Sequence, residues 1–343
     1  MAMRQRGVDP ELARGLRNFW YPILKSDDLQ DKPCGIRRLG EDLVLWRDSQ
    51  QRVHLFADYC PHRSAKLSLG QVTGDRLACW YHGLQFDTAG QCVFVPTAPD
   101  ATPDPRLRTT PYPVSESGGL IWGYIGDVER FPPPPLSIPE ELTSPEWCGW
   151  IDTQTWDVNY LLVLDNVVDS MHTPFLHGGA GAVGDVANPS RVQVIPGEDG
   201  FRVQNEPLPG YEREDHFEGM TFHLPNWVRL DIPIPVPGGP LRILAYVTPI
   251  DESQCQPFFV RTRRVQGAER ELWREQWTQR FEQITRHIVW QDEVVVASQR
   301  GLESRLREHL LPQDRGVIHL RLVLNRELAR QREVAANAAA APA

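Results

Sequence analysis

The densest group of chemically active side chains in this 343-residue sequence lies between Asp165 and His177. The stretch combines two carboxylates, one amide and two imidazoles with residues that are otherwise apolar or small. Burying such a set without a partner of opposite charge is costly, so a bound cation is the expected partner. Two hydrogen-bonded histidines beside a helix end, with no metal, would be the structural alternative.

The spacing within this stretch suggests how its side chains are arranged. Asn166, Asp169 and His172 recur every three residues, so on one helix they would share a broad face. Pro174 has no N–H and clashes with the preceding turn, which predicts that the helix ends or kinks just before it and that His177 lies beyond the break. Two imidazoles, one carboxylate and open positions form the ligand set of non-haem Fe(II) oxygenases.

A second group consists of two short motifs, Cys60-Pro-His62 and Cys79-Trp-Tyr-His82, separated by sixteen residues. Each motif offers one thiolate and one imidazole, a combination that suits either zinc or a [2Fe-2S] centre of the Rieske kind. Zinc fingers usually pair Cys with Cys and His with His along the chain. The mixed motifs therefore favour the iron-sulfur centre over structural zinc.

A third group is found on a long helix predicted to begin near Ala268. Apolar side chains mark one buried stripe of this helix at Trp273, Trp277, Phe281, Ile284 and Ile288. The next position of the stripe is Asp292, which predicts a carboxylate that faces inward and meets a cation. Glu293 is the alternative ligand, although it turns away from the stripe. If the helix ended at Trp290, Asp292 would instead be an exposed loop residue.

Composition limits the other possibilities. The net charge of −9 and the pI of about 5.6 argue against nucleic-acid binding. No apolar run reaches membrane-spanning length and no apolar signal core follows the N-terminus, so a cytoplasmic protein is expected. The six cysteines are too scattered for a disulfide scaffold.

The pattern along the chain predicts two domains and a tail. Short β-type runs separated by turn residues, from about 35 to 125, indicate an antiparallel β domain. The proline run at 132–135 is a stiff spacer. We predict a first domain over 18–128, a second over 136–327, and a disordered tail over 328–343.

The second domain should combine a sheet with the long helix. Residues 178–200 are rich in Gly, Ala and Pro and are expected to form a loop. Strand-like runs follow at 200–205, 219–234, 241–249 and 257–265. The positions of eight side chains along the chain predict the lining of an apolar pocket, although ordinary core packing would explain these side chains equally well. They are Leu161, Leu162, Val167, Phe222, Trp227, Ile243, Val294 and Ser298.

The three groups together resemble the catalytic α subunit of Rieske non-haem iron aromatic-ring oxygenases, from about Trp20 to about Ser298. In order along the chain they read Cys-x-His-x16-Cys-x2-His, Asn-x2-Asp-x2-His-x4-His and a late Asp. The modest length and the Asp-Asn start of the second motif look most like the phthalate-dioxygenase branch. That branch includes vanillate and dicamba O-demethylases and works with a separate reductase.

The resemblance implies a role for each motif residue. Cys60 and Cys79 would hold one iron of the cluster, and His62 and His82 the other. The facial triad on the mononuclear iron would be His172, His177 and Asp292. In a head-to-tail homotrimer, Asp169 would bridge from His172 to His82 of the neighbouring subunit, and Asn166 would lie near the iron.

The resemblance also implies a fold and a function. The fold class would be α+β, mostly antiparallel β, with a Rieske β domain followed by a helix-grip (START-like) catalytic domain. The protein would be a terminal oxygenase that uses O2 and electrons from NAD(P)H, delivered by a reductase and in some systems a ferredoxin. It would demethylate or monohydroxylate a small aromatic substrate. A cis-dihydroxylating dioxygenase, a Rieske-type electron-transfer protein and a zinc-stabilised binding module are the alternatives.

Overall fold

The structure is a computed structural model that describes residues 7–178, 190–210, 219–232 and 240–340. It divides into two compact units, each described here by itself. Arg17–Ile138 forms the β unit, whereas the residues up to Leu16 join those from Pro139 onward in the sheet–helix unit. The sequence pattern did not anticipate that the N-terminal segment, with helix α1 (Pro10–Arg14), belongs to the second unit.

Short antiparallel strands build the β unit as three small sheets, as the alternating pattern predicted. The first sheet has the order β1 (Phe19–Lys25), β11 (Leu120–Ile125), β10 (Val114–Ser117). The second has the order β2 (Cys34–Arg38), β3 (Glu41–Arg47), β4 (Val53–Ala57), β9 (Pro111–Tyr112). The third has the order β5 (Gln71–Thr73), β6 (Arg76–Ala78), β7 (Gln85–Phe86), β8 (Cys92–Phe94).

Strand β3 is buried on both faces and so joins two cores. Leu43 and Leu45 pack into one apolar cluster, and Val44 and Trp46 pack into another, because alternate side chains of a strand point to opposite faces. The second cluster also encloses both cysteines of the Cys-x-His motifs. The loops that carry these motifs are therefore anchored to a packed core.

One antiparallel sheet organises the sheet–helix unit. Its strand order is β12 (Trp147–Thr153), β18 (Cys255–Arg264), β17 (Leu241–Pro249), β16 (Trp227–Ile232), β15 (Met220–His223), β14 (Gly200–Pro207), β13 (Ser190–Pro196). The loop predicted over 178–200 was wrong for β13, whose residues pair with β14 along their whole length. Residues 179–189 and 233–234 of the predicted loop and strand lie outside the described residues.

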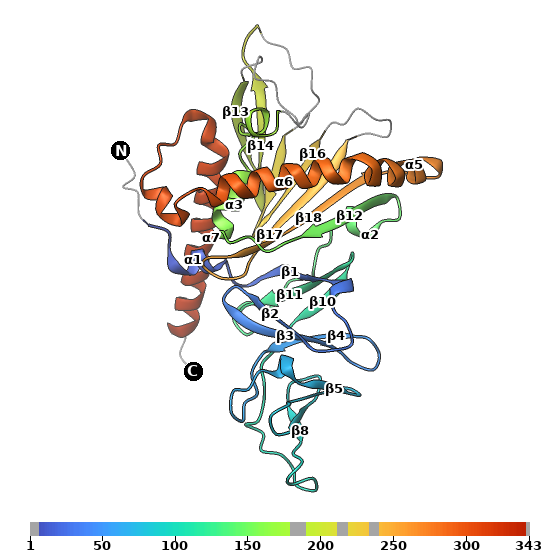
Figure 1. The fold of residues 1–343 in the computed structure, drawn as a ribbon. Helices are drawn as coiled ribbons and strands as arrows, with labels where there is room; N and C mark the ends of the chain where they lie inside the picture. Colours follow the sequence, from blue (N-terminus) through green and yellow to red (C-terminus); the bar gives the residue numbers. More distant parts are fainter. Residues whose placement is uncertain (1–6, 179–189, 211–218, 233–239, 341–343) are drawn as a thin grey trace. The chain divides into compact units, whose positions relative to one another are not determined.

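The predicted long helix is present and crosses the strands of this sheet (Figure 1). It consists of α5 (Ala268–Gln276), a π-helical turn (Trp277–Phe281) and α6 (Glu282–Ala297). Because α6 continues well past Trp290, Asp292 is a helical residue and not part of a loop.

The helix predicted through Asn166, Asp169 and His172 is interrupted. Helix α3 (Tyr160–Val167) ends before Asp169, and the short helix α4 (Thr173–Leu176) starts directly after His172. Pro174 lies in the first turn of α4, where its missing N–H costs nothing and its fixed φ favours the helix. Proline therefore starts a new helix here, whereas the sequence analysis expected it only to end one.

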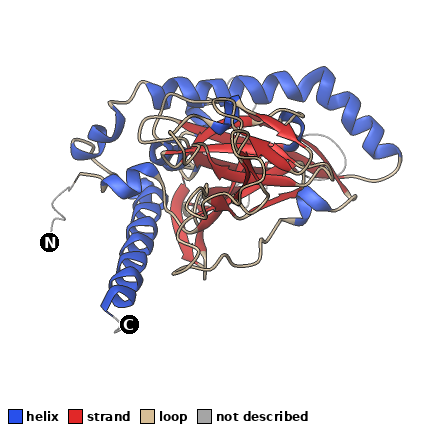
Figure 2. Ribbon diagram, turned by 90° about the horizontal axis from the view of Figure 1, so that it is seen from below, coloured by secondary structure: helices blue, strands red, loops and turns tan. Residues whose placement is uncertain are grey.

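The C-terminal segment also differs from its prediction. Helix α7 (Arg315–Ala340) continues through most of the predicted tail and ends beside the marked C-terminus (Figure 2). Alanine is the best helix former, so a run without core residues can still be helical. Leu320, Leu324 and Leu328 bury one side of this helix. Shorter helices complete the unit: α2 (Glu140–Thr143) and two 3-10 turns (Gly301–Leu306 and Pro312–Asp314).

Within the described residues, no helix has both the length and the apolar character that crossing a membrane requires.

Candidate metal centres

The two Cys-x-His loops turn their thiols inward and their imidazoles outward. In each loop the cysteine carbonyl accepts a hydrogen bond from the backbone N–H four residues later, which closes a tight turn. Cys60 and Cys79 are both 2% exposed, whereas His62 and His82 are exposed. A group held by all four side chains would thus have a buried sulfur end and a nitrogen end at the surface of the β unit.

These four side chains form two pairs and do not converge on one point. The pKa of the Cys60 thiol is raised to about 11, mainly by burial and also by the neighbouring Cys79 thiol. The imidazole rings of His62 and His82 have centroids 4.7 Å apart. Among the described residues, these four side chains do not form a group of three or more ligands that could hold a single metal ion. A two-iron cluster fits this arrangement, and its positive charge would keep both buried thiols ionised.

The second centre is the one group in the described residues with the geometry for a single metal ion: His172, His177 and Asp292. The Nε2 atoms of His172 and His177 lie 3.5 and 3.2 Å from the same Oδ1 of Asp292. The two rings are nearly perpendicular, at 83°. The structure brings together three residues that the sequence analysis had selected separately.

Charge and burial at this centre favour a cation. His177 is 3% exposed. Burial alone would lower the pKa of its imidazole, but the hydrogen bond to Asp292 raises that pKa overall. A metal ion would replace the proton shared by His177 and Asp292. Two imidazoles and one carboxylate suit Fe(II) and leave other coordination positions open.

Asp169 lies on the far side of His172 from the centre. Its Oδ1 accepts the Met171 N–H at 2.8 Å, and its Oδ2 is 3.8 Å from Nδ1 of His172. That Nδ1 is buried and has no hydrogen-bond partner among the described residues. Metal-bound histidines usually donate this N–H to a carboxylate, and Asp169 is the carboxylate within reach.

Gln291 holds the second imidazole, and the sequence analysis missed it. Its Oε1 lies 3.0 Å from Nδ1 of His177, so His177 donates there when its Nε2 faces the metal site. Asn166 donates to Oδ1 of Asp292 at 3.3 Å. The sequence offered only one indication of a role for Gln291, its position next to Asp292, because its partner His177 is 114 residues away in sequence.

Asp165 is not a ligand, although it begins the predicted metal-binding stretch. Its carboxylate accepts hydrogen bonds from Arg305 at 2.8 Å and from Arg321 at 2.7 Å. Arg305 also donates to the Leu161 carbonyl at 3.1 Å. The pairs attach helix α3 to the segments that follow α6 and so stabilise the helix that carries Asn166.

The alternative ligand and some of the predicted pocket residues have other surroundings. Glu293 accepts a hydrogen bond from Gln154 at 2.8 Å and is not part of the triad. Leu161 and Phe222 are fully buried core residues, and Val294 is 47% exposed.

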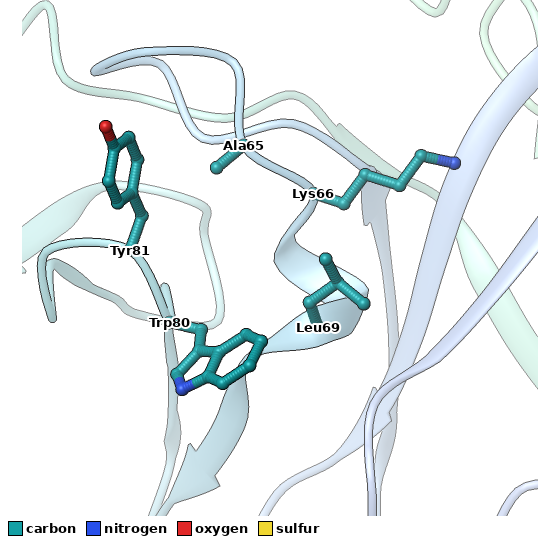
Figure 3. Close-up of a pocket in the computed structure, with 5 residues that line it drawn as sticks. All are labelled: Ala65, Lys66, Leu69, Trp80 and Tyr81. Atoms are coloured by element: carbon teal, nitrogen blue, oxygen red, sulfur yellow. The ribbon is translucent and has the colours of Figure 1, made fainter.

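A surface hollow adjoins the second cysteine loop (Figure 3). It is lined by Ala65, Lys66, Leu69, Trp80 and Tyr81. Trp80 is 79% exposed, and the Tyr81 ring lies 3.9 Å from the ring of His82. Exposed aromatic groups of this size are typical of contact surfaces.

Comparison with known proteins identifies both units. Residues 19–112 match the Rieske [2Fe-2S] domain family, and residues 156–330, about half of the chain, match the vanillate O-demethylase oxygenase C-terminal domain family. The chain is 27% identical to the chloroacetanilide N-alkylformylase oxygenase component of Rhizorhabdus wittichii, over 91% of this chain and 95% of that protein. It is 35% identical to the dicamba O-demethylase oxygenase component of Stenotrophomonas maltophilia, but the match spans only 53% of each.

Solved structures show the same fold. The crystal structure of dicamba monooxygenase bound to dicamba has a TM-score of 0.76 and 25% identity, over 92% of this chain and 98% of that one. Both relatives named above are called oxygenase components, which implies a separate partner component. The chain therefore belongs to the Rieske non-haem iron oxygenases: it is an oxidoreductase of the oxygenase type, with a [2Fe-2S] cluster and a mononuclear iron as its cofactors.

Proposed function

We propose that the chain is a terminal oxygenase that oxidises a small aromatic molecule by O- or N-demethylation or by monohydroxylation. The observation that carries this proposal is the triad of His172, His177 and Asp292, in a chain that also holds a separate Cys/His centre. The relatives support the reaction class, because their names describe removal of alkyl groups from oxygen or nitrogen. Cis-dihydroxylation is the alternative outcome of the same site.

We assign the metal ligands as follows. Cys60 and Cys79 would hold one iron of the cluster, and His62 and His82 the other, in keeping with the buried sulfur pair and exposed nitrogen pair. The triad would hold the mononuclear iron. When bound, these groups supply single electrons and oxygen chemistry. The protein side chains fix their geometry and charge.

The side chains around the triad then have distinct tasks. Gln291 orients His177 by accepting its Nδ1–H, so that Nε2 faces the metal. Asn166 donates to Asp292 and restrains the carboxylate in the same way. Asp169 lies 3.8 Å from Nδ1 of His172, where it would accept the N–H of the metal-bound ring, and its side chain, 27% exposed, remains reachable from outside the unit.

The assembly we propose is a head-to-tail homotrimer with a separate reductase as electron donor, acting directly or through a ferredoxin. In it the exposed His82 of one subunit approaches Asp169 of the next, and electrons pass from His82 through Asp169 to His172. His82 and Asp169 each reach the surface of their own unit, which supports a contact between His82 of one subunit and Asp169 of the next. We also propose a cytoplasmic location, because the reductase takes its electrons from NAD(P)H.

Metal analysis and turnover test the function. The purified protein should contain about three irons per chain and little zinc. With NADH and a reductase of the vanillate-demethylase type, a screen of aromatic methyl ethers, N-alkyl aromatics and aromatic acids should give products that differ from the substrates by loss of a methyl group or gain of one oxygen.

Each alternative predicts another result. A Rieske-type electron-transfer protein would hold about two irons and give no oxidised product, but it would leave the triad unexplained. A zinc-stabilised binding module would contain zinc and have no red-brown colour. Either result would contradict the proposed function.

A further inference from the structure

A stack of three side chains crosses the two Cys/His loops of the β unit. The guanidinium carbon of Arg63, from the first loop, lies 5.5 Å from the centroid of the Tyr81 ring in the second loop. The Tyr81 centroid lies 3.9 Å from that of His82, with an angle of 37° between the two rings. The stack therefore runs from a cation through a phenol ring to an imidazole, and that imidazole belongs to a proposed ligand of the cluster.

Hydrogen bonds fix the backbone on both sides of Arg63. The Ser64 N–H donates to the Cys60 carbonyl, and the Cys60 N–H donates to the Ala65 carbonyl, both at 2.8 Å. Ser64 has a φ of 66° less 10°, that is 56°, in the left-handed region that residues with a side chain rarely adopt. Strained residues of this kind are found most often at functional sites. The loop thus holds Arg63 in one place, although its side chain is exposed.

No nearby carboxylate compensates the charge of Arg63. Residues 59–74 and 79–86 contain two cations, Arg63 and Lys66, and no Asp or Glu. Lys66 pairs with Asp42 at 3.8 Å, whereas Arg63 forms no ion pair within the ranges that the structure describes. In a chain with a net charge of −9, an uncompensated cation therefore lies beside the nitrogen end of the Cys/His centre.

The main consequence of the stack is electrostatic. Exposed cation–π contacts contribute little to the free energy of unfolding, so stability does not explain this one. The two separations place the guanidinium less than about 10 Å from the His82 ring, which is within one Debye length in 0.1 M salt. Reduction adds one electron to the cluster and makes it more negative. A cation at this distance therefore stabilises the reduced form more than the oxidised form.

We propose that Arg63, held over Tyr81, raises the reduction potential of the [2Fe-2S] cluster. The reductase loses one electron and the cluster gains it, and the positive charge makes this transfer more favourable. Arg63 touches neither iron nor substrate and acts only through its charge. Tyr81 fixes where that charge lies, because its ring offers a flat face on which the guanidinium stacks. This inference rests on the proposed assignment of His82 as a ligand and goes beyond the proposed function.

The reduction potential of the purified, iron-loaded protein tests the inference without turnover. It is measured at one pH by a mediated redox titration that follows the visible and EPR spectra of the cluster. R63M removes the charge and should favour the oxidised form about threefold to tenfold, a fall of about 30 to 60 mV for one electron. R63K keeps the charge and should restore most of the potential, whereas R63E should lower it further than R63M.

Salt and a matched control separate charge from structure. Raising the salt to about 0.5 M should shrink the difference between R63M and the wild type, because exposed charges are screened. The control is R76M, in the same unit, which removes an exposed arginine that donates to Gln85 at 3.2 Å. It should shift the redox equilibrium by less than about 1.5-fold. In a Y81L background, R63M should change the potential less than it does in the wild type, because the ring no longer places the charge.

Several outcomes would overturn the inference. They are a wild-type potential in R63M, a shift that R76M reproduces, a shift that persists in high salt, and an equal effect of R63M with and without Tyr81. If R63M keeps its potential but is reduced more slowly by the reductase, Arg63 is a docking residue instead. H82A checks the ligand assignment separately, because it should lose the cluster spectrum. A retained spectrum would overturn that assignment together with the inference, whereas an oxidised product from the substrate screen supports the proposed function whatever the potentials are.

Discussion

The two metal centres are built in opposite ways. The Cys/His centre consists of two loops whose turns close over four residues, anchored to a core of the β unit. The triad joins His172 and His177 to Asp292, on a helix more than a hundred residues later. A local centre depends on its turns, whereas an assembled centre depends on the packing that brings distant helices together. Substitutions can separate these two dependences.

The largest effect should come from H177A, which removes one of three ligands. We expect the mononuclear iron to be lost and turnover to fall below detection, because only two ligands remain. The cluster should be retained, so iron content should drop from about three to about two per chain, and the EPR signal of the reduced cluster should persist. Loss of that signal together with the mononuclear iron would contradict the independence of the centres.

The next effect concerns the packing behind the triad. D165N removes the carboxylate that pairs with Arg305 and Arg321, and leaves the buried Arg305 guanidinium without a carboxylate, whereas Arg321 keeps its pair with Glu308. We expect the sheet–helix unit to lose about 3–5 kcal/mol of unfolding free energy, measured by chemical denaturation. E252Q, in the exposed pair with Arg14, is the control and should change stability by no more than about 1 kcal/mol. Equal effects of the two variants would mean that the Asp165 pairs have no special role.

The same contrast explains what the sequence could predict. The motif spacing predicted the local centre, and the helical stripe predicted that Asp292 faces inward, because both are patterns within short segments. The break between α3 and α4 was missed because Pro174 suits the start of a helix as well as its end. The partners of Asp165 and the role of Gln291 were missed because they depend on contacts across more than a hundred residues. Packing, which no spacing rule describes, decides such contacts.

Electron transfer between the centres should depend on Asp169. D169N keeps the shape of the side chain but removes the negative charge that lies 3.8 Å from Nδ1 of His172. We expect both metals to remain bound and steady-state turnover to fall about 10- to 100-fold. Stopped-flow absorbance should show that a reduced cluster is reoxidised by O2 in the presence of substrate more slowly by the same factor. Wild-type turnover in D169N would refute the bridging role.

The smallest effect should come from Gln291, which touches the metal site only through His177. Q291L keeps the volume of the side chain but leaves the His177 Nδ1–H without its acceptor at 3.0 Å. We expect affinity for Fe(II), measured by titration of the chelator-treated protein, to fall about tenfold, the low end for a residue that supports a ligand. Q291E keeps an oxygen acceptor at the same place and should bind Fe(II) at least as tightly as the wild type. If Q291E loses as much affinity as Q291L, the hydrogen bond is not what matters, and packing of α6 against the His177 ring would explain the effect instead.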